Sequence, residues 1–190
     1  MKQFMIIAIA LIAVAGFAMP VFADTAASAT VNVKVDVNPN VSLSPINVNV
    51  DAGTVQTGTF TAFCQFMVDA NSEQVSFQVN ASNLYKGDDP TTTTYIPLDL
   101  SVGPVVQPVN GNATNFHGNT LAYTGAGPSV NGFATETTEV VKYESSQSGT
   151  FSQEVDVTVT WIQSNSQMPQ GEYSGVVQLL ATLLPATGTP

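Results

Sequence analysis

The sequence predicts an all-β protein built as an antiparallel β-sandwich. Apolar and polar residues alternate with a period of two along most of the chain after Ala23, as in Val155-Asp156-Val157-Thr158-Val159. This pattern is typical of half-buried strands. Asn, Gly, Pro, Ser and Thr separate the runs, and no stretch after Ala23 has apolar residues at helical spacing. Runs of strands without intervening helices are typical of sandwiches and barrels.

The alternation predicts ten strands. They are expected at residues 29–37, 41–50, 54–68, 73–82, 95–107, 120–124, 130–135, 137–143, 149–163 and 172–184. Several glycines interrupt the pattern between residues 108 and 136, so a long, partly irregular excursion between strands is expected there.

The first 23 residues have the order of a secretory signal peptide. Lys2 provides the positive n-region, an apolar segment runs from Phe4 to Phe17, Pro20 breaks a helix, and the small residue Ala23 precedes Asp24. The alternative is an uncleaved anchor, because the apolar run is nearly long enough to span a membrane. We expect cleavage after Ala23 and secretion to the cell surface or exterior, through the periplasm in a Gram-negative cell.

The chain is expected to have four parts. These are a signal peptide at 1–23, an N-terminal extension or first strand at 24–37, a sandwich domain at 38–185 and a tail at 186–190. Cleavage would leave 167 of the 190 residues, a length that suits one sandwich with a substantial core.

The charge of the chain excludes two classes of partner. The mature part would keep three lysines and no arginine against 14 acidic residues, a net charge of −11. A nucleic-acid binder needs cations to displace the counterions of phosphate, and an anionic membrane surface makes a similar demand. We therefore expect no nucleic-acid partner, and no membrane partner after signal cleavage.

Cys64 is the only cysteine, so no disulfide can form within the chain. It shares an alternating face with Phe60, Ala62 and Phe66, which favours a buried small hydrophobe. A disulfide bond to another chain, or a role as an attachment point, is the alternative. A nucleophilic role would need a basic neighbour to lower the pKa of the thiol, and none lies nearby in the sequence.

No pattern indicates a catalytic, cofactor or metal site. Asp88 and Asp89 lie in a Gly-Asp-Asp-Pro turn, but calcium needs about 6–8 converging oxygen ligands, and turn chemistry explains the pair. His117, the only histidine, has no zinc-ligand partner beyond Cys64, and no serine lies in a Gly-x-Ser-x-Gly elbow. We expect a protein that is not an enzyme and that carries no cofactor.

The end of the chain contains a sortase-like spelling. Leu184-Pro185-Ala186-Thr187-Gly188 has the LPxTG order. That signal also requires a hydrophobic segment and a basic tail, whereas only Thr189 and Pro190 follow. We interpret it as the last strand running into a turn.

Two segments resemble a known family. One is the alternating run Ala29-Thr-Val-Asn-Val-Lys-Val-Asp-Val37, and the other is Pro169-Gln-Gly171-Glu-Tyr173-Ser-Gly175. The second is similar to the "P-x-G-x-Y-x-G" opening of the last strand in Ig-like pilin subunits, including spore-coat-U-like and archaic chaperone–usher pilins. The sandwich is accordingly expected to be Ig-like or jelly-roll-like.

The resemblance implies assembly by strand exchange. In those families each subunit lacks a strand that the N-terminal segment of the next subunit supplies, and a periplasmic chaperone can be a further partner. Here Val31, Val33, Val35 and Val37 would form the assembly strand. This chain departs from the family in having no disulfide and in ending on a proline-containing tail.

Two functions follow as hypotheses. In the first, the protein is a structural subunit of an extracellular fibre, pilus-like polymer or surface layer, which self-associates by strand addition. The alternative for residues 29–37 is the first strand of the chain's own sandwich. In the second, the domain is a soluble secreted binding module for carbohydrate or a surface ligand. Its candidate aromatic residues are Tyr95, Phe116, Tyr123 and Phe133.

Overall fold

The structure of the chain is a computed structural model. It describes residues 37–47, 50–51, 53, 57–109, 113–115 and 119–184. The chain divides after Asp36, and every described residue belongs to the second unit, Val37–Pro190.

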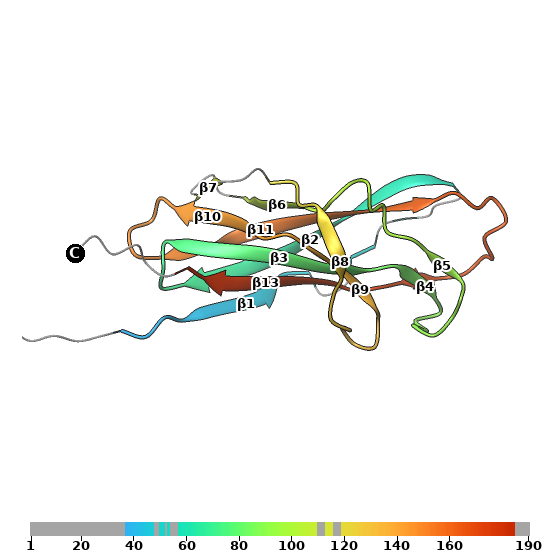
Figure 1. Cartoon of the computed structure of the whole chain (residues 1–190), viewed down its shortest axis with the longest axis horizontal. Coiled ribbons are helices and arrows are strands. Elements are labelled where there is room, and N and C mark those ends of the chain that lie inside the picture. The colour runs from blue at the N-terminus through green and yellow to red at the C-terminus, as the bar shows by residue number, and fades with distance from the viewer. Residues whose placement is uncertain are drawn as a thin grey trace, which may run out of the picture. The chain divides into compact units, whose positions relative to one another are not determined.

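The predicted all-β fold is confirmed, because the described residues form strands and no helix (Figure 1). Within that part of the chain no helix is long and apolar enough to cross a membrane. The strands are β1 (Val41–Pro45), β2 (Gly58–Ala70), β3 (Gln74–Ser82), β4 (Leu84–Lys86), β5 (Tyr95–Ile96), β6 (Val105–Pro108), β7 (Ala113–Asn115), β8 (Tyr123–Ala126), β9 (Thr135–Thr138), β10 (Val141–Ser145), β11 (Phe151–Gln163), β12 (Tyr173–Ser174) and β13 (Val177–Leu183).

The strands form two larger sheets and one small sheet, and all strand pairs are antiparallel. The first sheet has the order β1-β2-β11-β6. In the second, β3 pairs with β13 along one edge and with β9 and β10 along the other, and β8 and β7 lie outside these. The small sheet has the order β12-β4-β5.

The longest ladder joins β2 and β11 from Gly58↔Gln163 to Ala70↔Phe151. Side chains alternate across a strand, so the β-branched residues Val155, Val157 and Val159 point inward together and are fully buried. The matched alternation of the two strands fixes the register, because a slip of one residue would expose this set.

The core lies between the two larger sheets. Phe77 of β3 contacts the rings of Phe151 and Tyr143, with centroid separations of 5.7 and 5.8 Å. Trp161 of β11 stacks on Phe60 of β2 at 5.9 Å, and its indole N–H donates 3.0 Å to the carbonyl oxygen of Ser82. Each large side chain buried in this way contributes about 1.5–3 kcal/mol.

The expected strand at 95–107 is wrong in its interior. Only β5 and β6 form there, and the chain between them turns where the Val102 N–H donates 3.1 Å to the Asp99 carbonyl oxygen. Gly103 then passes so close to Leu121 that a Cβ would lie 1.5 Å from its carbonyl oxygen. Two prolines, Pro97 and Pro104, remove further ladder donors.

Other expected strands differ in their limits. The one at 41–50 ends at Pro45, after which the Ile46 N–H still donates 2.8 Å to the Gln65 carbonyl oxygen. The one at 130–135 is instead a two-residue hairpin turn, with Asn131 at φ 51° and Gly132 at φ 86°. Strands β4 and β7 were not expected.

Candidate functional site

Among the described strands, none bridges the edge strands β1 and β13 of the two larger sheets, and we call the gap between these two edges the open seam. The order β1-β2-β11-β6 is that of the A-B-E-D sheet of an Ig sandwich, and β3 and β13 take the places of strands C and F. No ladder joins β1 to β13, and no described strand stands beyond β13 at the place of strand G. Figure 1 shows the two strands running alongside each other in opposite directions.

The opposite seam is closed by the chain itself. The Val106 N–H donates 2.9 Å to the Asn119 carbonyl oxygen, and the Leu121 N–H donates 2.8 Å to that of Pro104. The same segment continues into β8, which pairs with β9 of the second sheet. Val106 and Leu121 are buried in consequence. Among the described strands, the sandwich is therefore closed on this side and has no bridging strand on the side of β1 and β13.

Apolar side chains line the open seam and remain only partly buried. Val41 and Leu43 of β1 contact the core from one edge, and Val177, Ala181 and Leu183 of β13 contact it from the other. Half-buried apolar residues at facing sheet edges would stabilise the domain further if an added strand removed them from water. An unpaired edge also presents a row of free N–H and C=O groups to any added strand.

A hollow of about 630 Å³ lies at one end of the seam. Val37, Pro39, Leu183 and Leu184 are among the residues that line it. Its walls include the turns after β2 and before β11, where the Gly149 N–H donates 2.6 Å to the Glu73 carboxylate. The end of the seam is thus widened and mostly apolar.

Asn71 holds the described chain in place just before β1. Its side-chain amide donates 2.9 Å to the Asn38 carbonyl oxygen and its side-chain oxygen accepts 2.6 Å from the Asn40 N–H. The Asn71 N–H donates 3.1 Å to the Asn40 carbonyl oxygen. Three hydrogen bonds to two residues, Asn38 and Asn40, therefore hold the start of the described chain against Asn71, beside the hollow that Val37 lines.

Only part of the predicted assembly strand can be placed. Val31, Val33 and Val35 lie outside the described residues. Val37 is 79% exposed, lies outside any strand and lines the hollow. The predicted tail, residues 186–190, also lies outside the described residues.

The last-strand motif has a specific geometry. The Tyr173 hydroxyl donates 2.7 Å to the Pro169 carbonyl oxygen, the bond of the tyrosine corner at the start of strand F in Ig sandwiches. Gly171 has φ 152°, and a Cβ there would lie 2.9 Å from Cε of Lys86. A Cβ on Gly175 would lie 2.5 Å from the Asn83 carbonyl oxygen. Both positions therefore require glycine.

The cysteine and the two aspartates considered as site residues do not form a common site in the described part of the chain. Cys64 is buried on the inward face of β2, and burial raises the pKa of its thiol to about 11. Asp88 accepts a hydrogen bond from Ser174, while Asp89 accepts 2.9 and 2.6 Å bonds from the N–H and hydroxyl of Thr91. The described residues include no group of three or more His, Cys, Asp or Glu able to hold a metal ion, and His117 is not among them.

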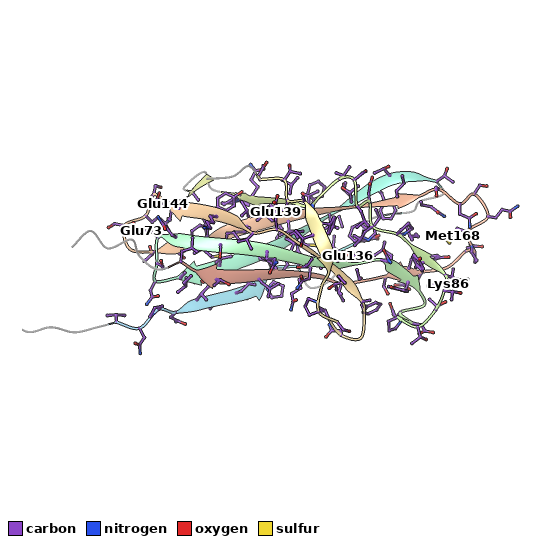
Figure 2. The ribbon with its side chains drawn as sticks, in the orientation of Figure 1. Glu73, Lys86, Glu136, Glu139, Glu144 and Met168 are labelled. Atoms are coloured by element: carbon purple, nitrogen blue, oxygen red, sulfur yellow. The ribbon has the colours of Figure 1, made fainter. Side chains whose placement is uncertain are left out.

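Two of the four candidate aromatic residues come together. Tyr95 and Phe133 both contact the ring of Tyr85, with centroids 5.5 and 5.7 Å apart. Tyr123 lies elsewhere, and burial is the main cause that raises the pKa of its hydroxyl, with Glu136 and Asp99 adding to it. Phe116 is outside the described residues. Figure 2 shows Lys86 of β4 and Met168 at the end opposite Glu73 and Glu144.

The sequence analysis did not identify the residues that line the open seam or the tyrosine that joins the aromatic rings. Nothing in the alternation distinguishes Val41 and Leu43 from fully buried strand residues, because exposure depends on which strand lies beside them. Tyr85 was missed because β4 has only three residues. Asn71 had a local signal, since Asn often bonds nearby backbone groups in turns.

No protein-family model matches the chain, and a comparison with curated proteins finds no match. Function is therefore inferred from the geometry of the domain.

Proposed function

We propose that this chain is a secreted structural subunit of an extracellular fibre, pilus-like polymer or surface layer, and that copies assemble by β-strand addition. The observation that carries the proposal is the open seam between β1 and β13, lined by half-buried apolar residues. Strand addition satisfies the free backbone groups of an edge and places alternate side chains in pockets.

The N-terminal segment has the pattern that such a seam accepts. Its valines recur at every second residue, so they lie on one face of an extended chain. The inward positions of β13 recur with the same period over seven residues. The matched sets are Val31, Val33, Val35 and Val37 in the segment, and Val177, Leu179, Ala181 and Leu183 in β13.

The energies are large enough for a stable assembly. Each valine that is fully buried contributes about 1.5–3 kcal/mol. Four such residues give a sum comparable to the ~5–15 kcal/mol stability of a typical domain. An added strand would also bury the partly exposed lining of the seam.

Insertion requires the seam to widen. Cα atoms of β1 and β13 come within 8 Å of each other at their nearest approach. A strand paired with both edges needs about 9.5 Å between them, twice the usual strand spacing. We infer that the free subunit has a partly collapsed seam, and in a Gram-negative cell a periplasmic chaperone that holds it open is a further proposed partner.

The alternative occupant is the same chain's own segment. To fill its own seam the segment would have to turn back at Asn38-Pro39-Asn40, where the chain is fixed to Asn71. Those residue types suit a turn, so the sequence permits either occupant. The oligomeric state separates the two, because a chain that fills its own seam would be monomeric.

Removal of the segment tests whether the seam needs it. A chain beginning at Asn38 should unfold at markedly lower urea concentration than the mature chain, because the seam lining stays exposed. A synthetic peptide of residues 24–37 added in trans should restore the midpoint, whereas a peptide with Val33→Asp should not. Equal midpoints for the truncated and mature chains would contradict a role for the segment at the seam.

A further inference from the structure

A second cluster of aromatic side chains lies outside the main core. Tyr85 of β4 and Tyr95 of β5 are direct cross-strand partners, and Phe133 of the Val130–Phe133 hairpin packs on the same Tyr85 ring. Tyr85 is 8% exposed, yet it does not belong to the core cluster between the sheets. We call Tyr85, Tyr95, Phe133 and Pro90 the aromatic tip.

The aromatic tip keeps one ring at the surface in a fixed position. Tyr95 is 41% exposed, while Phe133 and Pro90 are half-buried. The turn at Gly132 abuts the loop after β4, since a Cβ on Gly132 would lie 3.6 Å from Cγ of Pro90. A ring supported by neighbouring rings can take up a ligand without a further loss of side-chain entropy.

Polar acceptors lie in the loop that follows β4. Ser174 is the cross-strand partner of Tyr85 on its other side and donates a hydrogen bond to the Asp88 carboxylate. In the same loop, the side chain and then the N–H of Thr91 lower the pKa of Asp89, so this carboxylate stays ionised. The Lys86 N–H also donates 3.1 Å to the Thr94 carbonyl oxygen and helps to hold the loop.

We propose that the aromatic tip binds a sugar ring of a neutral polysaccharide. An aromatic face matches the apolar C–H face of a pyranose, and the carboxylates of Asp88 and Asp89 accept hydrogen bonds from its hydroxyls. Ligand sites typically combine aromatic surface with a few placed polar groups. The net charge of −10 and the adjacent carboxylates disfavour an anionic polymer. This binding does not depend on strand addition.

Native gel electrophoresis of the mature chain through mannan or hydroxyethyl cellulose tests the proposal, with alginate as the anionic comparison. At least one neutral polymer should retard the chain, and Tyr95→Ala should weaken this binding about tenfold. Phe63→Ala is the matched control, because Phe63 is also a highly exposed ring, at 60%, but lies on β2. That variant should bind as the unaltered chain does. Monomeric and assembled fractions are run separately.

Two outcomes overturn the proposal: no retardation by either neutral polymer, or equal retardation of the unaltered chain and Tyr95→Ala. Retardation by alginate alone is one case of the first outcome. Thermal unfolding checks that Tyr95→Ala is folded. If it is not, Tyr95→Phe should bind normally and Tyr95→Leu should bind weakly, since only the first keeps the ring.

Discussion

The hydroxyl of Tyr173 and the carbonyl oxygen of Pro169 are joined by a 2.7 Å hydrogen bond across four residues. The bond closes the bend through which the chain passes from β11 of the first sheet toward β13 of the second. A tyrosine phenol is protonated at neutral pH and can donate this bond, and burial raises the pKa of Tyr173 further. The corner directs β13 along β3, with its other edge unpaired among the described strands.

Loss of this bond should destabilise the domain. Tyr173→Phe is expected to lower the free energy of unfolding by about 0.5–1.5 kcal/mol. Tyr123→Phe is the control, because the Tyr123 hydroxyl is buried with no hydrogen-bond partner and its removal should be neutral or stabilising. Urea unfolding measures both. A larger loss from Tyr123→Phe than from Tyr173→Phe would contradict the assignment.

Two buried glutamines on β11 should respond oppositely to replacement by methionine. Gln153 is 1% exposed and neither polar atom of its amide has a partner, whereas the amide of Gln163 exchanges two 3.0 Å bonds with the backbone of Asn165. Gln153→Met should raise the free energy of unfolding by about 1–3 kcal/mol, and Gln163→Met should lower it. If urea titrations show that both variants are destabilised equally, the Gln153 amide has hydrogen-bond partners in solution and the prediction is wrong.

Much of the fold could be predicted from the sequence because its signals are local. The alternation around Val157 and Val79 gave the long strands β11 and β3 within two residues at each end. The strand at 95–107 failed because Gly103 lies against Leu121, a contact that only the folded chain contains. Short strands such as β4 carry too few residues to show a period.

The candidate site was less predictable. The alternation could identify Val31 to Val37 as one apolar face of an extended segment. It could not show whether the domain has an unpaired sheet edge to which this segment could add. That edge depends on the pairing of Leu179 with Val79 and on the absence of a described partner at the other edge of β13, which are properties of distant segments. Tyr95 and Phe133 were candidates as individual rings, and only the position of Tyr85 joins them.

Cys64 should make the free energy of unfolding decrease as the pH rises above 9. Burial raises the pKa of its thiol from 9.0 to about 11, so the folded chain keeps the proton to higher pH than the unfolded chain. The resulting stability is full below pH 9 and is lost as pH rises to 11, by roughly 2–3 kcal/mol. Urea titrations at pH 7, 9 and 10.5 should show the stability difference between the unaltered chain and Cys64→Ala shrinking. Parallel pH curves would contradict the prediction.

Export with cleavage after Ala23 should be visible in the mass of the secreted protein. Signal peptidases cut after small residues, and Ala23 follows the helix-breaking Pro20. Intact mass spectrometry of protein recovered from the cell exterior should give a chain beginning at Asp24. Recovery of material that retains Met1 would contradict cleavage.

The oligomeric state of the mature chain tests strand addition most directly. Denaturing gels of unboiled samples should show a ladder of multiples that boiling collapses to one band. Val33→Asp should abolish the ladder, because it forces a carboxylate into an apolar pocket. Asn32→Asp adds the same charge on the opposite face of the segment and should leave the ladder intact. A chain that stays monomeric at every concentration, or a ladder that survives Val33→Asp, would contradict assembly through this segment.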